Sequence, residues 1–387
     1  MMYIRLAIIT THPIQYYAPL FKLLHERGNI TINVFYTFGA NGTEKFDEGF
    51  DKIIKWDISF LDSYPFEWVS NVANTPSSAK FIGIKNPELI NQIERWKPDA
   101  ILVYGWAYHS HLQVLRHFKT KVPVFFRGDS TLLDDVKGFK TWFKTILKKW
   151  IYHHIDYALY TGSNNKAYFK KSGLKESQLI FAPHAIDNKR FSIRNPDKVN
   201  LIRESLGVEQ NEVLILFAGK FEQKKDPLIL LHAFSKLSLA SVSLLFVGSG
   251  YLEERLHAES SGLNNVYFKG FQNQTEMPAL YQACDLFCLP SRGPGETWGL
   301  AVNEAMACGK AILVSNKVGC AIDLVKPGKN GEIFNAGDLN DLTDKLKKMI
   351  GERRSGLSRM GQHSEEIIQT WDFETQVKAI EATLNEK

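Results

Sequence analysis

The residue types best suited to chemistry gather in Pro290–Gly309, which reads P-S-R-G-P-G-E-T-W-G-L-A-V-N-E-A-M-A-C-G. The apolar run Leu286–Leu289 precedes this Gly- and Pro-rich loop, and the pattern predicts a helix that opens near Trp298 and Gly299. Amide groups at a helix start bind anions, and small residues let a phosphate approach the backbone. We therefore expect a phosphate-bearing ligand here.

Two glutamates accompany the predicted helix start. Glu296 lies in the loop, and Glu304 lies about one and a half turns into the helix. With phosphates on the helix start, Glu296 would meet the sugar end of the ligand and Glu304 would accept hydrogen bonds from ribose hydroxyls. The alternative, two solvated surface acids, leaves the Gly/Pro loop and the strand-to-helix switch unexplained.

A second charged cluster, Gly219–Pro227, reads G-K-F-E-Q-K-K-D-P. Lys220 and Lys225 stand around a predicted strand-to-helix turn, where two cations can converge on a diphosphate and offset charge that develops on it. The alternative is a solvated lysine-rich turn. The neighbouring glutamate loop favours the phosphate interpretation.

Both halves of the chain alternate between short apolar runs and helical patterns. The predicted strands of the first half are Arg5–Thr10, Thr31–Thr37, Ala100–Tyr104, Val122–Arg127 and Tyr157–Thr161. Those of the second half are Val213–Ala218, Ser243–Val247, Asn265–Phe268, Leu286–Leu289 and Ala311–Val314. Such alternation is typical of parallel sheets covered on both faces. We predict an α/β fold of two doubly wound, Rossmann-like domains that face a central cleft.

The length of 387 residues favours two domains, which we place at 1–190 and 191–370, with a closing amphipathic helix at 371–387. The two halves differ in charge. Residues 1–193 hold 25 Lys/Arg against 17 Asp/Glu (+8), and the remainder holds 22 against 25 (−3). This excess predicts an anionic partner for the first half, but no nucleic-acid-binding signature accompanies it.

Composition excludes several classes of protein. Glycine and proline total 41 of 387 residues (27 + 14), so disorder and collagen-like repetition are excluded. Apolar stretches such as Ala100–Tyr104 fall far short of the ~20 residues of a spanning helix, and the amino terminus lacks a signal peptide's apolar core. The four cysteines suit a reducing compartment, so we expect a soluble cytoplasmic protein.

These clusters resemble the retaining glycosyltransferases of family 4, which have the two-Rossmann GT-B fold. Glu296 and Glu304 match that family's Glu-x7-Glu motif, and Gly219–Lys225 is similar to its Gly-Arg…Lys phosphate-binding turn. Further matches are Phe246-Val-Gly-Ser-Gly-Tyr, Leu289-Pro-Ser, Glu304-Ala-Met-Ala-Cys-Gly, Pro183-His-Ala-Ile-Asp and, as in one bacterial subgroup, Thr11-His-Pro-Ile-Gln-Tyr-Tyr and Arg127-Gly-Asp-Ser. The resemblance is strong over 179–349 and weaker over the first half.

The resemblance implies transfer of a sugar, with retention at the anomeric carbon, from a nucleotide diphosphate sugar to a glycan or lipid-linked acceptor in bacterial polysaccharide biosynthesis. The first domain would bind the acceptor and the second the donor, and the closing helix would cross back to the first domain. Glu296 would contact the donor sugar and Glu304 the ribose. The diphosphate would be held by Gly219, Lys220, Lys225, Trp298, Gly299 and Leu300.

Two features depart from the family pattern. Thr11-His12-Pro13 replaces the glycine-rich loop that many members carry after the first strand, and Lys220 lacks the bidentate fork of arginine. The chain contains no Asp-x-Asp sequence. We therefore expect no metal and no cofactor, with lysines and a helix start in place of Mg²⁺.

Polar residues also follow the strands of the first half. His12, His109 and His111 are predicted at strand carboxyl ends, facing the cleft. The resemblance assigns a sugar contact to either Trp106 or His109, of which we favour His109. A zinc site at His109 and His111 would need further ligands. Arg127 and Asp129 either contact the acceptor or form a structural ion pair.

The segment Val136–Ile155 is basic and holds no acid; its lysines are Lys137, Lys140, Lys144, Lys148 and Lys149. Aromatic and aliphatic residues alternate with them. One interpretation is peripheral contact of residues 137–152 with the inner face of the cytoplasmic membrane. The other is an ordinary domain helix with an aromatic core face and solvated lysines.

Four other activities compete with the transferase interpretation. A nucleotide-sugar epimerase would act without an acceptor, and a non-catalytic binder would keep donor affinity alone. A pyridoxal-dependent phosphorylase needs a much longer chain. A nicotinamide oxidoreductase is poorly supported, because Gly248-x-Gly250 lacks the third glycine of its fingerprint.

Overall fold

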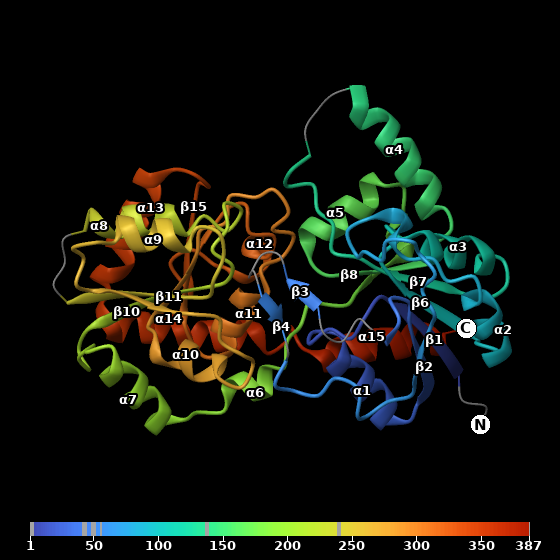
Figure 1. Cartoon of the computed structure of the whole chain (residues 1–387), viewed down its shortest axis with the longest axis horizontal. Helices are drawn as coiled ribbons and strands as arrows, with labels where there is room; N and C mark the ends of the chain where they lie inside the picture. Colours follow the sequence, from blue (N-terminus) through green and yellow to red (C-terminus); the bar gives the residue numbers. More distant parts are fainter. Residues whose placement is uncertain are drawn as a thin grey trace. The chain divides into compact units, whose positions relative to one another are not determined.

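The computed structural model describes residues 4–40, 45–47, 52–54, 56–135, 139–237 and 241–386 (Figure 1). Its contacts divide the chain into two compact units. Unit 1 comprises Met1–Lys45, Ser59–His184 and Phe373–Lys387, and unit 2 comprises Phe46–Ile58 and Ala185–Asp372. Apart from the segment Phe46–Ile58, the chain therefore passes into unit 2 after His184 and returns to unit 1 at Phe373.

Unit 1 is built on a seven-stranded parallel sheet with the order β5-β2-β1-β6-β7-β8-β9. The strands are β1 (Ile4–Thr10), β2 (Ile30–Tyr36), β5 (Phe66–Trp68), β6 (Ala100–Tyr104), β7 (Val124–Arg127), β8 (Tyr157–Tyr160) and β9 (Leu179–Phe181). Leu6 and Ile8 of β1 pack in one core cluster and Ala7 and Ile9 in the other, because successive strand side chains point to opposite faces. Both faces of the sheet are therefore covered.

The helices of unit 1 are α1 (Ala18–Arg27), α2 (Leu89–Trp96), α3 (His109–Phe118), α4 (Phe139–Tyr152), α5 (Ser163–Lys171) and α15 (Phe373–Asn385). Short 3-10 turns lie at η2 (Phe81–Gly83) and η3 (Glu176–Gln178). Helices α1 and α15 cover one face of the sheet, and α2, α3 and α5 cover the other. Arg27 of α1 binds Glu374 at 3.0 Å and Glu381 at 2.9 Å, which fixes the closing helix to unit 1.

Unit 2 contains a six-stranded parallel sheet with the order β12-β11-β10-β13-β14-β15. Its strands are β10 (Val213–Ala218), β11 (Val242–Val247), β12 (Val266–Lys269), β13 (Leu286–Leu289), β14 (Ala311–Ser315) and β15 (Gly331–Phe334). The helices are α6 (Asn188–Ser192), α7 (Pro196–Ser205), α8 (Pro227–Ser235), α9 (Glu253–Glu259), α10 (Met277–Ala283), α11 (Leu300–Ala307), α12 (Ala321–Leu324), α13 (Leu339–Gly351) and α14 (Arg353–Ile368). A separate two-stranded sheet pairs β3 (Lys45–Asp47) with β4 (Lys52–Ile54).

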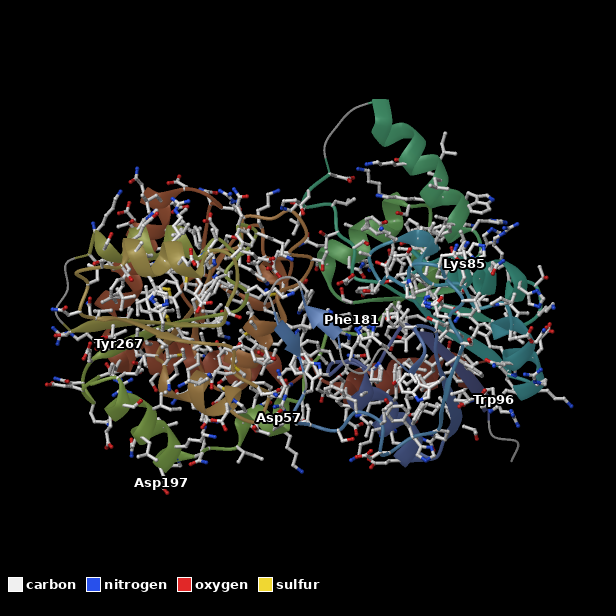
Figure 2. The ribbon with its side chains drawn as sticks, viewed as in Figure 1. Asp57, Lys85, Trp96, Phe181, Asp197 and Tyr267 are labelled. Atoms are coloured by element: carbon white, nitrogen blue, oxygen red, sulfur yellow. The ribbon has the colours of Figure 1, made fainter. Side chains whose placement is uncertain are left out.

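The predicted fold class is confirmed, because both units are parallel-sheet, Rossmann-like α/β structures. The strand Leu286–Leu289 has the predicted bounds. The edge strands β9 and β15, of three and four residues, are not among the predicted strands. Phe181 on β9 and Tyr267 on β12 mark the partly exposed edges of the two sheets (Figure 2). No helix within the described ranges is long and apolar enough to cross a membrane.

Candidate functional site

The strand order of unit 2 creates a crevice at the carboxyl ends of β10 and β13. From β10 the chain runs to β11 and β12 on one side, and it then crosses to β13 on the other side. Ligands of open α/β sheets bind where the loops after two such strands diverge. The Arg292 amide donates to the Lys224 carbonyl at 2.9 Å. The two charged clusters of the sequence therefore lie together at this point.

The turn after β10 packs against the turn after β11 through glycine. Gly219 has φ 155° and Gly248 has φ 144°, both in the region that favours glycine. A Cβ atom at Gly248 would lie only 1.9 Å from the Gly219 carbonyl oxygen. This close approach fixes the turn from which Lys220 and Lys225 project.

The loop after β13 is held in shape by its contacts with the segment before α12. The Gly319 amide donates to the Glu296 carbonyl at 3.1 Å, and the Cys320 amide donates to the Trp298 carbonyl at 2.9 Å. A Cβ atom at Gly319 would lie 1.8 Å from the Thr297 carbonyl oxygen. Glycine at 319 is therefore required for this loop conformation.

Glu296 and Lys225 form an ion pair at the crevice. The Glu296 carboxylate, more than nine-tenths buried, accepts hydrogen bonds from Lys225 Nζ at 2.5 Å and from Ser291 Oγ at 2.8 Å. Burial alone would raise the pKa of Glu296, but the charge of Lys225 and these two hydrogen bonds hold it below its ordinary value. Glu296 is therefore a carboxylate at neutral pH.

Glu304 is held by a tyrosine from a neighbouring helix. It lies in α11 and is buried, and its Oε2 accepts a hydrogen bond from the Tyr281 hydroxyl of α10 at 2.8 Å. Tyr281 is itself buried, against Phe191 and Phe287. The carboxylate that we predicted as a ribose ligand is thus oriented by a phenol.

The remaining predicted residues of unit 2 differ in what they can contact. Lys220 is half-buried beside Gly219. The Trp298 indole is buried, donates to Asn303 Oδ1 at 2.9 Å and packs on Trp371 at a ring distance of 5.3 Å. Only the backbone of Trp298 can therefore serve a ligand. Gly299 caps α11 at φ 95°, and helix geometry leaves the first amides, at Leu300 and beyond, without intrahelical acceptors.

Unit 1 has its own switch point at the carboxyl ends of β1 and β6. His12 follows β1 and is half-buried, with its Nδ1 2.9 Å from the Thr11 hydroxyl. Tyr104 ends β6, and within the described residues its buried hydroxyl has no hydrogen-bond partner. Burial raises the pKa of Tyr104 to about 12, so the hydroxyl is neutral.

The two neighbouring histidines of α3 have different environments. His111 is fully buried, with Nδ1 3.0 Å from the Tyr104 and Gly105 carbonyls and Nε2 2.8 Å from the Thr37 hydroxyl. Burial lowers its pKa to about 4. His111 is therefore a neutral structural residue, and the expectation that it faces a cleft is wrong. His109 is half-buried against Phe81, and in the part of the chain that the structure describes its Nδ1 has no partner.

Arg127 and Asp129 also differ. Arg127 is buried at the end of β7, and its guanidinium donates to the carbonyls of Ala182 at 2.8 Å and Pro183 at 3.2 Å. Its hydrogen bonds thus hold the segment that leads out of unit 1. Asp129 is exposed. Together with burial, its charge raises the pKa of Tyr17, which places the carboxylate near the tyrosines at this end of the sheet.

Sequence reasoning missed three residues that shape these crevices: Ser291, Tyr281 and Tyr104. Ser291 stands in the Leu289-Pro-Ser match and could have been found there. The sequence does not indicate a polar role for Tyr281 or Tyr104, because each occupies a position in a helix or a strand where an apolar side chain is expected.

The four cysteines are all buried, and burial raises the pKa of the Cys284 thiol to about 12. Within the described ranges, no group of three or more His, Cys, Asp or Glu side chains could hold a metal ion.

Comparison with known proteins connects unit 2 to one family. Residues 198–366 match the family model of glycosyl transferases group 1. The chain is 27% identical over 285 residues to sulfoquinovosyl transferase SQD2 of Arabidopsis thaliana. The aligned region covers 70% of this chain and 53% of that protein. It is 30% identical over 214 residues to mannosylfructose-phosphate synthase of Agrobacterium fabrum. This aligned region covers 51% of this chain and 46% of that protein. The chain thus spans about half the length of these curated relatives.

Solved structures share the fold over the whole chain. Anabaena Alr3699/HepE in complex with UDP and glucose is 18% identical, covers 100% of both chains and has a TM-score of 0.72. Sucrose-phosphate synthase from Thermosynechococcus elongatus is 17% identical, covers 99% of both chains and has a TM-score of 0.73. Residues 198–366 thus match the group 1 glycosyl transferases, and the chain as a whole shares the two-unit GT-B fold of these solved structures.

Proposed function

We propose that the protein is a retaining glycosyltransferase, which moves a hexose from a nucleotide diphosphate sugar to a glycan or lipid-linked acceptor in bacterial polysaccharide biosynthesis. The observation that carries the proposal is the pair of the half-buried Lys225 with the buried Glu296 at the β10/β13 switch point, beside the start of α11. A cation, a carboxylate and helix-start amides in one crevice suit a ligand that joins a diphosphate to a sugar.

Lys225 would exchange partners when the donor binds. Without donor, its ammonium pairs with Glu296 at 2.5 Å. A diphosphate carries more negative charge than one carboxylate, so it would draw Lys225 away, with Lys220 and the amides of Trp298, Gly299 and Leu300 as further ligands. Glu296 would keep the Ser291 hydrogen bond and present a charged oxygen to the donor sugar. Glu304, held by Tyr281, would accept from the ribose hydroxyls.

The proposed reaction breaks the bond between the anomeric carbon and the phosphate oxygen, and the electron pair leaves with the diphosphate. The acceptor oxygen forms the new bond on the same face of the sugar. Its proton passes to the departing phosphate oxygen, which is the adjacent base when configuration is retained. Lys220, Lys225 and the start of α11 would neutralise the leaving charge without a metal ion, and the Glu296 carboxylate would stabilise positive charge on the sugar ring.

Acceptor binding is proposed at the switch point of unit 1. His12, Asp129 and the Tyr104 hydroxyl, which has no partner among the described residues, lie at the carboxyl ends of its strands and offer hydrogen bonds to a sugar hydroxyl. His109, at the start of α3, is proposed as a sugar contact through Nδ1, which has no partner in the described part of the chain. The hydrogen bonds of Arg127 to two backbone carbonyls favour a supporting role for that residue.

A uridine nucleotide is the first donor to test, because the Anabaena structures hold UDP and UDP-glucose. We would measure thermal shifts with UDP, GDP, dTDP, CMP, ADP and NAD, with and without EDTA. A ligand at about 100 times its Kd stabilises by about 2.7 kcal/mol. A shift with one nucleoside diphosphate supports the donor site, whereas a shift with NAD alone contradicts it.

Turnover then distinguishes a transferase from its alternatives. The matching nucleotide sugar, incubated with glycan and lipid-linked acceptors, should yield free nucleoside diphosphate and an α-linked product from an α-linked donor, as read by mass spectrometry and NMR. Isomerised nucleotide sugar in the absence of acceptor would indicate an epimerase. Loss of turnover in EDTA, restored by Mg²⁺, would contradict the metal-free part of the proposal.

A further inference from the structure

Helix α4 carries large apolar side chains on an outward face. Ile146 is 48% exposed, Leu147 52% and Trp150 43%. Trp150 follows Leu147 by three residues and Ile146 by four, so it shares a face of the helix with each of these two neighbours. We call Ile146, Leu147 and Trp150 the α4 stripe. Figure 1 shows α4 standing out at the margin of unit 1.

The opposite side of α4 anchors the helix to unit 1. Ile151 and Tyr152 are buried, and the Trp106 indole donates to the Tyr152 hydroxyl at 3.3 Å. The Lys148 ammonium lies 4.6 Å from the centre of the Tyr168 ring. Apolar groups therefore occur on both sides of this helix, and the interpretation in which its aromatic face is core is wrong for Trp150.

The surroundings of the α4 stripe are basic. Lys144 and Lys149 are exposed on α4, and the Arg116 guanidinium lies 5.5 Å from the centre of the Trp150 ring. The sequence from Val136 to Ile155 contains no Asp or Glu. The predicted contact segment 137–152 begins outside the described residues, because 136–138 lie in a gap and the side chains of 139–143 are not described.

Exposed large apolar residues in unit 2 provide a comparison. Ile193, Leu201 and Ile322 are as exposed as the α4 stripe, but each lies on a different segment. Single exposed apolar residues are ordinary on protein surfaces, whereas contiguous ones with a polar rim mark interaction sites. The α4 stripe is therefore a contiguous exposed apolar surface that needs an occupant.

We propose that the α4 stripe docks on an anionic lipid bilayer. A tryptophan and two aliphatic side chains suit the boundary between headgroups and acyl chains, and the flanking lysines complement anionic headgroups. Three apolar side chains offer too little area for a stable protein dimer, but they suffice for weak membrane binding when positive charge adds to it. Docking does not depend on the proposed transferase activity, because it is measured as binding.

The experiment is cosedimentation of the full chain with vesicles of phosphatidylcholine alone and of phosphatidylcholine with about one third phosphatidylglycerol. We expect binding to the anionic vesicles, weakened by salt, and at least about tenfold weaker binding to the neutral ones. Equal binding to both kinds of vesicle, or no binding to the anionic ones, would overturn the proposal.

Two variants test the two components of the surface. The triple variant, Ile146→Ser with Leu147→Ser and Trp150→Ser, should no longer sediment with vesicles. Its control is Leu201→Ser, at a position on α7 that is 64% exposed. Lys144→Gln with Lys149→Gln should weaken binding about thirtyfold at low salt, since each lysine near an anionic bilayer contributes roughly fivefold. The exposed Lys347→Gln with Lys378→Gln is the matched control and should bind as the parent does.

Circular dichroism and melting temperature establish that the variants fold, and the lysine pair keeps the test decisive if the triple variant does not fold. Parent-like vesicle binding by the lysine pair overturns the proposal. A third outcome also overturns the proposal. The parent would self-associate in analytical ultracentrifugation without binding vesicles, and Ile146→Ser alone would abolish the self-association. The stripe would then be a contact with a second copy of the chain.

Discussion

The crevices of the two units occupy equivalent places in their sheets but hold different chemistry. In unit 2 the polar side chains at the crevice satisfy one another: Lys225 and Ser291 bind Glu296, and Tyr281 binds Glu304. In unit 1 the buried arginine, Arg127, binds backbone carbonyls, and the Tyr104 hydroxyl has no partner within the described ranges. Where polar side chains already bind one another, a charged ligand has to replace one of the partners. A hydroxyl such as that of Tyr104, without a partner in the described chain, can form a hydrogen bond with a neutral ligand directly. The difference is consistent with a diphosphate in unit 2 and a sugar hydroxyl in unit 1.

The largest expected effect follows removal of the Glu296 charge. Glu296→Gln keeps the shape of the side chain and one acceptor oxygen but loses the charge, so we expect a fall of about 10³-fold in kcat with little change in the Kd for UDP. Steady-state kinetics and calorimetry measure the two. Glu276→Gln, at an acid that pairs with Lys198 in the same unit, should leave both unchanged. A non-catalytic binder would show the same UDP affinity and no activity in the parent.

Lys225→Ala should reduce kcat by about 10²-fold, because it removes the ammonium that we propose neutralises the leaving diphosphate. Binding of uridine, which lacks phosphates, should hardly change. The adjacent Lys224→Ala is the control, since Lys224 pairs with Glu222 at 3.7 Å rather than with Glu296. Equal losses in turnover and in uridine affinity would assign Lys225 a structural role.

Two tyrosine substitutions sharpen the comparison further. Tyr281→Phe leaves the buried Glu304 without its hydroxyl partner, so we expect a loss of about 2 kcal/mol in the free energy of unfolding and a roughly tenfold higher KM for the donor. Chemical denaturation and kinetics report these values. An unchanged donor KM in a folded variant would show that Glu304 does not need the phenol to meet the ribose.

Tyr104→Phe should act in the opposite direction on stability. It removes a buried hydroxyl that has no partner in the described chain, so the protein should become more stable by about 1 kcal/mol. If the hydroxyl serves the acceptor, KM for the acceptor rises while the Kd for UDP stays constant. A destabilised Tyr104→Phe protein would contradict the assignment of the hydroxyl as unpaired.

The smallest effect concerns acid stability. Because the folded pKa of Glu296 lies below its ordinary value of 4.5, the unfolded chain binds the proton at higher pH than the folded chain does. The stabilising contribution of this group is therefore complete above about pH 4.5 and is lost as the pH falls through the folded pKa. Melting temperatures between pH 3 and pH 7 should fall less steeply at the acid end for Glu296→Gln than for the parent. Parallel curves would mean that the pKa of Glu296 is not shifted on folding.

Sequence patterns were most informative in the turn after β10 and the loop after β13. Glu296, Lys225 and the strand before the loop could be identified because glycine, proline and charge follow a strand in a recognisable order. The histidines of the first half could not be sorted in this way. His109 and His111 stand two residues apart on one helix, and only packing makes one a buried partner of Thr37 and leaves the other half-buried.

The sequence by itself determined the alternation of strands and helices, and with it two parallel sheets whose strand ends carry the polar residues. Hydrophobic periodicity is local, so it can be read from neighbouring residues. Only the tertiary structure decided that Tyr281 holds Glu304, that Arg127 binds backbone carbonyls and that the α4 stripe faces outward. These contacts join residues far apart in the chain or depend on which face of a helix finds a neighbour. Packing against the rest of the fold selects them, and residue type does not.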